Sequence, residues 1–357
     1  MKEPRLSGVS DAAELGPARR ASRPTMRDVA EHAGVSLKTV SRVVYMEPGV
    51  RPTVQRRVEE SVAALRFRRN VVARSLRTGH HLGSIGLIVA DLMNPFYSAI
   101  AKAVEGVAGR HNAVVIIASS GEDALREREL VTNLLDRPVD GMIVVPAGND
   151  HRYLEPERRM GARIVFLDRA AGMIEADAVV LDNVNGARRA VNHLIKRGHR
   201  RIGFVGDSAA IHTAQERLEG YRGALEAGGL SYDSELVRQG SSVVELAESA
   251  AGDMLAMNDP VTAIFAANNR NCVGVLRAVR ASQRQIAVIG FDDFELADLL
   301  PTPVTVVSYD AGEVGRSAAE LLFARLAGDS RPPQRIVIPT RLIQRGSGEV
   351  PPWDRPN

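Results

Sequence analysis

TMRDVAEHAGVSLKTVSRVV, residues 25–44, is the stretch of sequence that most strongly decides the fold. Thr25 is the predicted N-cap of a helix, because Asp28 stands three residues further on and the two form a variant of the capping box. Apolar residues recur at helical spacing up to Gly34, where the helix ends in a tight turn. Ser36 can cap a second short helix. The pattern predicts a helix-turn-helix.

The outer face of the second helix carries side chains that can read DNA. A recognition helix contacts base edges through its N-terminal residues, and hydroxyl groups beside it can reach phosphates. The predicted DNA-binding residues of this segment are Ser36, Leu37, Lys38, Thr39, Ser41 and Arg42. The alternative is an ordinary helical hairpin with a charged outer face. We disfavour it because the glycine turn, the helical spacing and the basic face all occur together in this segment.

Charge is distributed unevenly along the chain. Residues 1–80 hold 16 of the 46 Lys and Arg residues and 8 of the 43 Asp and Glu residues, a net charge of +8 that leaves −5 for the remainder. A basic N-terminal region on a mildly acidic body is typical of a protein that binds a polyanion. On charge alone, an Arg-rich solvated terminus is an equal alternative.

After residue 80, short β-branched runs alternate with helical segments. The runs are Ile85–Ala90, Ala113–Ser119, Gly141–Val145, Arg163–Leu167, Ala178–Leu181, Ile202–Val205, Ala263–Ala266 and Ile286–Ile289. Such alternation is typical of parallel sheets covered by helices on both faces. Two units of this kind predict a two-lobed α/β core, whose ligands bind beyond the carboxyl ends of the strands.

Composition narrows the class of protein. The sequence has no apolar run of the roughly 18–20 residues that a membrane helix needs, and residues 1–23 lack the apolar stretch of a secretory signal. Because Cys272 is the only cysteine, an internal disulfide and a cysteine metal site are excluded. We expect a cytoplasmic protein with no membrane partner and no cofactor.

Several enzyme motifs are missing from the sequence. It has no G-x-S-x-G elbow, no P-loop and no G-x-G-x-x-G after a strand, and its eight histidines show no metal-ligand spacing. We therefore expect neither an enzyme nor a metal site. A solute-binding protein for transport and a sugar-metabolising enzyme that share the core fold are the alternatives. The basic N-terminal region argues against the first, and the missing phosphate loop against the second.

Residues 25–44 resemble the headpiece of the lactose-repressor (LacI/GalR) family, and the resemblance extends to Gly346. It is carried by the order and spacing of further motifs, namely Ile85–Val89, Asn94–Tyr97, Val139–Ile143, Leu194–Val205, Arg217–Tyr221, Phe265–Asn268 and Ile289–Asp293. The resemblance implies a repressor-type transcription regulator that binds a palindromic operator in double-stranded DNA as a homodimer. It also implies a periplasmic-binding-protein-like sensor core and a small-molecule effector, a sugar or sugar derivative.

Asn70–Arg77, within the predicted hinge at residues 69–80, resemble the hinge helix of that family. So short a segment is hardly helical alone in water, and the resemblance implies that it folds on DNA beside its dimer mate. It would then insert a leucine into the minor groove and kink the duplex. Leu76 matches this leucine, and Arg74 is a further predicted DNA contact. An ordinary linker is the alternative.

The resemblance places the effector site at strand ends of the core. A polyhydroxylated ligand needs charged and amide groups for hydrogen bonds and an aromatic face for its C–H surface. The predicted effector-binding residues are Phe96, Asp168, Thr213, Arg217, Asn268, Asp292 and Tyr309. Plainer roles are open for some of them: Asp168 and Asp292 can cap turns, Arg217 can form a surface ion pair, and Phe96 can belong to the core.

The chain departs from the family pattern in both regions. Tyr45 and Arg51 stand where the family has Asn and Ser, and Arg66 and Arg69 where it has Gly and Pro, which adds phosphate attraction ahead of the hinge. Asn269 replaces a common Asp and removes one charge. The expected organisation is a disordered tail (1–24), a helix-turn-helix domain (25–68), a hinge (69–80), an N-terminal sensor lobe (84–180 plus 308–330) and a C-terminal sensor lobe (182–306 plus 333–346).

Overall fold

The computed structural model describes residues 24–67, 83–137, 139–240 and 243–353. The chain forms two compact units, Met1–His80 and His81–Asn357. The described part of the first unit is called the headpiece, and the described part of the second unit is called the core. Each unit is described by itself. The predicted hinge, with Arg74 and Leu76, lies outside the described residues, as does the tail up to residue 23.

The headpiece is a helix-turn-helix followed by a third helix, as predicted. Thr25 and Asp28 form the predicted capping box: the Thr25 N–H donates to Asp28 Oδ2 at 2.6 Å, and the Asp28 N–H to Thr25 Oγ1 at 3.3 Å. Gly34 ends the first helix with φ of 62°, a left-handed conformation that glycine adopts without strain. The helices are α1 (Met26–Ala33), α2 (Leu37–Val44) and α3 (Pro52–Ala64), packed around Val29, Ala30, Ala33, Val40, Val44 and Val58.

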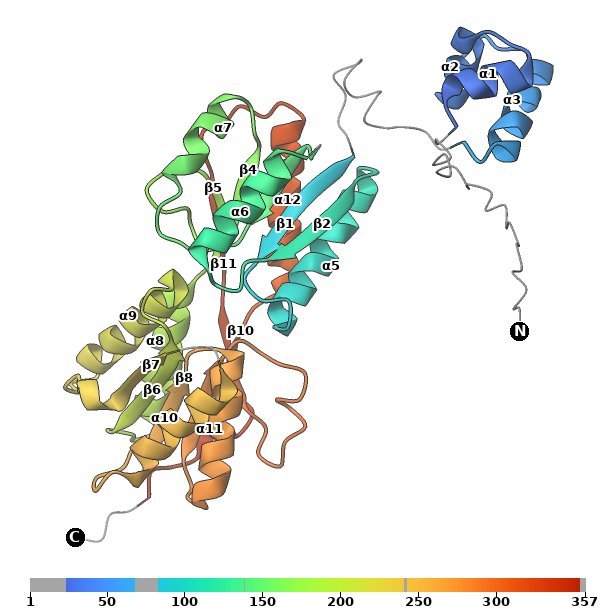
Figure 1. Cartoon of the computed structure of the whole chain (residues 1–357). Coiled ribbons are helices and arrows are strands. Elements are labelled where there is room, and N and C mark those ends of the chain that lie inside the picture. The colour runs from blue at the N-terminus through green and yellow to red at the C-terminus, as the bar shows by residue number, and fades with distance from the viewer. Residues whose placement is uncertain (1–23, 68–82, 138, 241–242, 354–357) are drawn as a thin grey trace, which may run out of the picture. The chain divides into compact units, whose positions relative to one another are not determined.

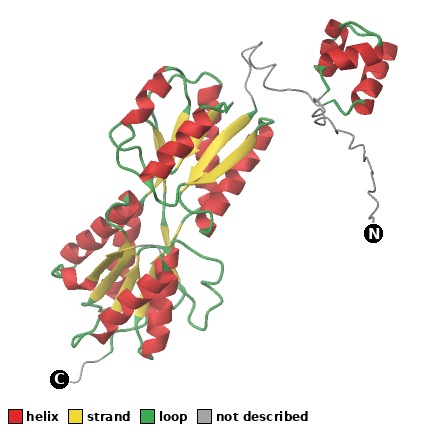
Figure 2. Ribbon diagram, viewed as in Figure 1, coloured by secondary structure: helices red, strands yellow, loops and turns green. Residues whose placement is uncertain are grey.

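The core consists of two lobes, each a sheet with helices on both faces (Figures 1 and 2). The first lobe contains β1 (Ser84–Val89), α5 (Pro95–Arg110), β2 (Val114–Ser119), α6 (Ala124–Leu135), β3 (Gly141–Val144), α7 (Glu155–Arg159), β4 (Ile164–Asp168), β5 (Asp177–Leu181), α12 (Ala311–Leu326) and β11 (Arg335–Ile338). The second contains α8 (Asn183–Lys196), β6 (Ile202–Asp207), α9 (His212–Ala227), β7 (Val237–Gly240), α10 (Val244–Ala256), β8 (Ala263–Ala266), α11 (Asn269–Ser282), β9 (Ala287–Phe291), β10 (Thr305–Ser308) and β12 (Arg341–Ile343).

The two sheets share one strand order. Within the described residues each has six strands, arranged β2-β1-β3-β4-β5-β11 and β7-β6-β8-β9-β10-β12. The paired strands are parallel, except that β12 runs antiparallel to β10. The order reverses between β1 and β3 and between β6 and β8, and ligands of such sheets bind where it reverses.

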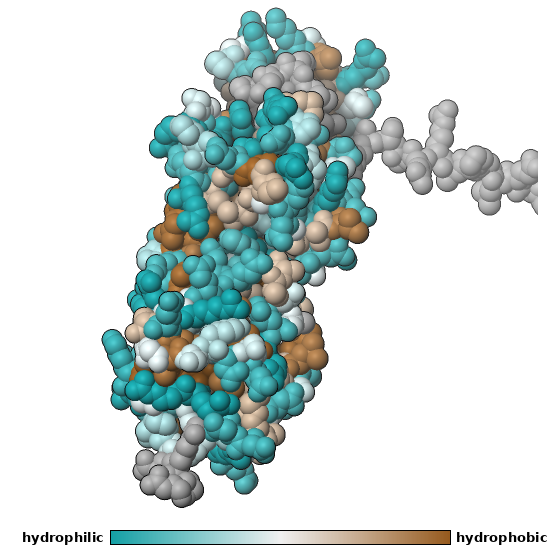
Figure 3. All heavy atoms as spheres, turned by 90° about the vertical axis from the view of Figure 1, so that its left-hand side faces the viewer, coloured by the Kyte–Doolittle hydropathy of each residue, from teal (hydrophilic) through white to brown (hydrophobic). Residues whose placement is uncertain are grey.

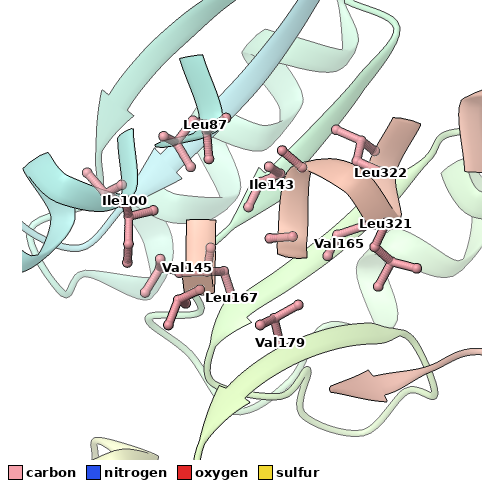
Figure 4. Packing of buried hydrophobic residues seen from close by; sticks show 14 of the residues in the cluster. Leu87, Ile100, Ile143, Val145, Val165, Leu167, Val179, Leu321 and Leu322 are labelled. Atoms are coloured by element: carbon pink, nitrogen blue, oxygen red, sulfur yellow. The ribbon is translucent and has the colours of Figure 1, made fainter. Parts of the chain in front are cut away.

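Apolar side chains from the strands and the covering helices form the core of each lobe. Figure 4 shows one such cluster in the first lobe, where Leu87, Ile143 and Val165 from three strands meet Ile100 of α5 and Leu322 of α12. All five side chains are fully buried. Because burying such a side chain contributes roughly 1.5–3 kcal/mol, α12 is a main stabilising element of the first lobe although it lies far along the chain.

The chain crosses between the lobes three times, after β5, after β10 and between β11 and β12. The prediction that residues 333–346 belong to the second lobe was therefore wrong for β11, which pairs in parallel with β5 of the first sheet. The reason is that Ile338 fills the apolar core of the first lobe. The first and third crossings lie side by side, since the Asp182 N–H donates to the Ile338 carbonyl at 3.1 Å. Arg189 reinforces them by donating to the Thr340 carbonyl at 2.8 Å.

Polar residues predominate on the face of the molecule that Figure 3 shows. Hydrophobic residues form separate patches there. Across the residues that the structure describes, no helix is both long enough and apolar enough to span a lipid bilayer.

Two glycines of α9 give a matched test of helix packing. A Cβ on Gly220 would lie 2.3 Å from the Val184 carbonyl oxygen of α8, whereas a Cβ on Gly223 would meet nothing within 4 Å. Gly220→Ala must push α8 and α9 apart and is expected to lower the free energy of unfolding by about 1–3 kcal/mol. Gly223→Ala, the control, is expected to raise it by up to about 1 kcal/mol, because alanine favours helix. Urea denaturation measures both, and equal effects would contradict the packing.

Candidate functional site

The second helix of the headpiece presents an exposed basic face. Val40 and Val44 are buried, so the opposite side of α2 faces solvent. Lys38 is exposed, and Arg42 is half-buried one helical turn further on. Leu37 is 50% exposed on the same side of the helix. These side chains, with the half-buried Ser41, could enter a groove of DNA together.

Ser36 and Thr39 have a structural role in the same helix. The Ser36 hydroxyl oxygen accepts the Thr39 N–H at 3.1 Å and lies 2.8 Å from the Thr39 hydroxyl. The Ser36 hydroxyl therefore caps the N-terminus of α2 and is bonded to the Thr39 hydroxyl, so a phosphate contact by either group would be shared with these bonds. The positive end of the helix dipole lies at the same place and favours an anion there.

Two departures from the family pattern are visible in the headpiece. Arg51 precedes α3, and its side chain makes no capping hydrogen bond. Pro52 is the first residue of this helix and has no backbone N–H that would need a partner. Arg66 has φ of 50°, the left-handed conformation that favours glycine. Arg66 adds an exposed positive charge at this turn.

A cleft of about 380 Å³ lies between the carboxyl ends of the two sheets. The predicted effector residues that line it are Phe96, Asp168, Thr213, Arg217, Asn268 and Asp292. Tyr309 lies behind this lining: its hydroxyl donates to Asp292 Oδ1 at 2.7 Å, and its ring meets Phe96 edge-on with the centroids 5.6 Å apart. We therefore interpret Tyr309 as support for the wall and not as a direct contact.

Arg217 organises the second-lobe side of the cleft. Its Nε donates to Asn183 Oδ1 at 2.9 Å and its Nη1 to the Ala267 carbonyl at 2.6 Å. Its Nη2 lies 3.3 Å from Asp292 Oδ1, and its guanidinium stacks 3.9 Å from the centre of the Phe291 ring. The side chain is 6% exposed, which excludes the alternative of a surface ion pair.

Asp168 and Asp292 stand at the ends of equivalent strands, β4 and β9. Both have positive φ, 67° and 68°, a conformation that aspartate tolerates better than most side chains. Their carboxylates bind side chains, which argues against the alternative that they only cap turns. Asp292 accepts from Tyr309 and Arg217, while Asp168 has only weak contacts: the Tyr97 hydroxyl and Arg169 Nε each lie 3.5 Å from its Oδ2.

The carboxyl group of Asp168 is strongly perturbed by its surroundings. Burial raises its pKa from 3.8 to about 6, against the opposing effect of the Arg169 and Arg217 charges. A poorly solvated carboxylate with weak partners in a cleft is typical of a functional group, because a ligand can satisfy it.

Asp207 is a cleft residue that the sequence reasoning missed. It ends β6 and accepts the side-chain amides of Asn268 at 2.6 Å and Asn271 at 3.1 Å. Asn268 Oδ1 in turn accepts the Asn271 N–H at 2.7 Å, so Asn268 caps α11 and positions Asp207. Burial raises the pKa of Asp207. The position at a strand end was the signal that could have found it.

The first turn of α11 bonds across the cleft to the first lobe. Asn269 Nδ2 donates to Asn94 Oδ1 at 3.0 Å, and Arg270 Nη1 to Asp91 Oδ2 at 2.7 Å. An aspartate at position 269 could not donate this hydrogen bond, so the departure from the family pattern has a structural consequence here. The sequence reasoning did not anticipate Asn94, Asp91 or Arg270 as cleft residues.

A further ion pair lies on the first-lobe side of the cleft. Arg169 donates to both carboxylate oxygens of Glu122 at 2.6 Å, and also to the Pro146 carbonyl at 2.7 Å. Planar bidentate pairs of this kind are strong and directional. The cleft therefore combines charged groups that are already paired with two less well paired aspartates. For a cation, Asp168 has only the 3.5 Å contact to Arg169, which is shared with Glu122, and Asp207 forms no ion pair among the described residues.

Comparisons with known proteins agree with this architecture, a DNA-reading headpiece joined to a ligand-binding core. Residues 25–70 match the model for "Bacterial regulatory proteins, lacI family", and residues 191–348 the model for "Periplasmic binding protein-like domain". The transcriptional regulator CelR of Thermobifida fusca is 32% identical over 340 residues, which span 92% of this chain and 99% of CelR.

Two solved structures are similar over most of the chain. A complex of CelR with cellobiose has a TM-score of 0.67 at 30% identity and covers 91% of this chain and all of that one. The Lac repressor dimer bound to operator and the anti-inducer ONPF has a TM-score of 0.82 at 25% identity, covering 92% and 99%. The chain belongs to the lacI family of bacterial regulatory proteins, whose relatives here are transcription regulators and not enzymes.

The perturbed Asp168 carboxyl gives a prediction on stability. Its folded-state pKa is raised to about 6 from 3.8, so the ionised form costs free energy of folding above pH 6, and this cost disappears as the pH falls toward 4. Asp168→Asn is expected to raise the free energy of unfolding of the ligand-free protein by up to about 3 kcal/mol at pH 7.5. Urea denaturation from pH 4.5 to 7.5 measures the difference from wild type, which should shrink toward low pH. A variant less stable at pH 7.5 would contradict the prediction.

Proposed function

We propose that the protein is a repressor-type, sequence-specific transcription regulator that binds a palindromic operator as a homodimer. Its cleft takes a sugar or a sugar derivative as effector. The observation that carries the proposal is the presence, in one chain, of an exposed basic recognition helix and of a polar cleft at the strand ends. The protein acts in the cytoplasm, where its target DNA lies.

The dimer follows from the geometry of DNA reading. One recognition helix spans only a few base pairs in the major groove, and two-fold symmetry doubles the sequence that is read. The Lac repressor, a relative with the same fold, is a dimer on its operator. A solute-binding protein for transport would need no basic headpiece, so we regard that alternative as weaker.

The proposed effector chemistry rests on the cleft. Carboxylate, amide and guanidinium groups converge there beside the Phe96 ring, which suits a ligand rich in hydroxyl groups. The relative CelR binds cellobiose in its solved complex. The proposed DNA contacts are Ser36, Leu37, Lys38, Thr39, Ser41, Arg42, Arg74 and Leu76, the last two in the segment outside the described residues.

The proposed mechanism is linkage between cleft and DNA. A ligand that bridges the lobes favours one relative position of the two sheets and so alters the spacing of the two hinges in the dimer. The hydrogen bonds from Asn269 and Arg270 to the first lobe already favour contact between the lobes without ligand. The effector must therefore act against, or in addition to, these bonds.

Base reading by α2 is tested on an operator obtained by binding-site selection from random DNA. Lys38→Ala and Arg42→Ala are each expected to cost about 1–3 kcal/mol on the operator and much less on a scrambled duplex, because a guanine edge is lost. Arg66→Ala, the control, should weaken both duplexes alike through a lost phosphate contact. Fluorescence anisotropy at several salt concentrations measures affinity and should give a steep salt dependence. Equal losses for Lys38→Ala on both duplexes would make Lys38 a phosphate contact.

The proposed insertion of Leu76 between two base pairs of the minor groove is the step that distinguishes DNA binding with the hinge from binding by the helix-turn-helix alone. Unstacking a base step costs a few kcal/mol, which burial of the leucine and added phosphate contacts must offset. Leu76→Ala is expected to reduce both operator affinity and DNA bending, whereas Leu76→Ile should largely preserve them. A circular-permutation gel-shift assay measures the bend. If Leu76→Ala still bends the DNA fully, Leu76 does not insert into the duplex, and the hinge only connects the headpiece to the core.

A further inference from the structure

Every cationic side chain that lines the cleft already has a carboxylate partner. Three guanidinium groups and five carboxylates line it within the described residues. Arg169 pairs with Glu122 at 2.6 Å, Arg217 with Asp292 at 3.3 Å, and Arg270 with Asp91 at 2.7 Å. The three pairs cancel, and the lining keeps the charge of two remaining carboxylates.

The remaining carboxylates come from different lobes. Asp168 ends β4 in the first lobe, is 4% exposed and has only contacts of 3.5 Å. Asp207 ends β6 in the second lobe, is held by two neutral amides and forms no ion pair among the described residues. Both line the same cleft. A ligand placed between them meets hydrogen-bond acceptors on both sides.

We propose that Asp207, together with Asp168, selects an uncharged or amine-bearing, hydroxyl-rich ligand and rejects phosphorylated and carboxylated ones. This rests on the proposed function, in that the effector occupies this cleft. A phosphate is held most strongly by charge-assisted hydrogen bonds from cationic donors, and each guanidinium that lines this cleft already has a carboxylate partner. A second anion beside Asp168 and Asp207 would instead add like charges in a poorly solvated site.

Asn268 acts in this arrangement as a positioning residue. Its amide nitrogen holds Asp207 and its oxygen caps α11, so it fixes the carboxylate relative to the helix. The charge of Asp207, and not only its hydrogen-bonding capacity, then sets the selectivity. If Asp207 only supported the loop after β6, its charge would have no effect on which ligands bind.

The test uses the full chain and matched probes at pH 7.5. Isothermal titration calorimetry is run with glucose, glucosamine, glucose 6-phosphate and gluconate, with ribose and ribose 5-phosphate, with fructose and fructose 1-phosphate, and with cellobiose. We expect at least one uncharged or amine-bearing probe to bind, and each phosphorylated or carboxylated probe to bind more weakly than its parent. A phosphate that binds more tightly than its parent, or a panel in which no uncharged or amine-bearing probe binds, overturns the proposal.

Variants of Asp207 separate charge from structure. Asp207→Asn is expected to weaken the responding probe by about ten- to a hundredfold, as for a lost hydrogen bond to a charged group, and to reduce the discrimination against its phosphorylated partner. Asp207→Glu keeps the charge and should keep that discrimination even if affinity falls. Asp253→Asn, at an exposed position of α10, is the control and should change neither. Unchanged discrimination in Asp207→Asn that circular dichroism finds folded overturns the proposal.

Operator binding by the same preparations keeps the two proposals apart. If the wild-type protein does not bind the operator, the proposed function as a transcription regulator is contradicted, whichever ligand the cleft selects. Normal operator binding together with a preferred phosphorylated probe would contradict the selectivity and leave the regulator intact.

Discussion

The buried guanidinium of Arg217 is the constraint on which the second half of the cleft depends. It bonds to Asn183 at the start of α8, to the Ala267 carbonyl after β8 and to Asp292 after β9, and it stacks on Phe291. A buried charge is costly unless such partners satisfy it. Because the partners come from separate segments, satisfying this charge also fixes the loops that form the wall, so the wall is formed before a ligand arrives.

Much of this arrangement could be predicted from the sequence where the signals are local. The capping box of Thr25 and the turn at Gly34 depend on neighbours in the chain, and the residues that line the cleft follow strands that are easily recognised. The strand-end position of Asp207 could have marked it as a cleft residue, but its hydrogen bond to Asn268 and the ion pair of Arg270 could not be predicted, because they depend on partners 61 and 179 residues away. β11 was misplaced for a similar reason: its sheet is decided by where Ile338 can be buried.

The cleft is built from equivalent positions of the two lobes. Asp91 and Asp207 follow or end the equivalent strands β1 and β6, and Asp168 and Asp292 stand at the ends of β4 and β9. In each equivalent pair, one carboxylate is paired with an arginine of a helix, Asp91 with Arg270 and Asp292 with Arg217, and the other is not. The repeated fold therefore supplies four carboxylates in a nearly symmetric frame, and the arginines of individual helices decide which two are available to a ligand.

The three crossings between the lobes have a consequence for how the protein is made. A ribosome delivers the chain from its N-terminus, and domains generally fold as units as they emerge. The headpiece is contiguous and can fold early, but neither lobe of the core is. The first lobe lacks α12 and β11 until the chain has been extended past Ile338, and the second lobe lacks β12 until it has been extended past Ile343. The apolar face that Leu321 and Leu322 cover thus stays open through most of synthesis. Apolar surface exposed in this way makes a partly made chain prone to aggregation.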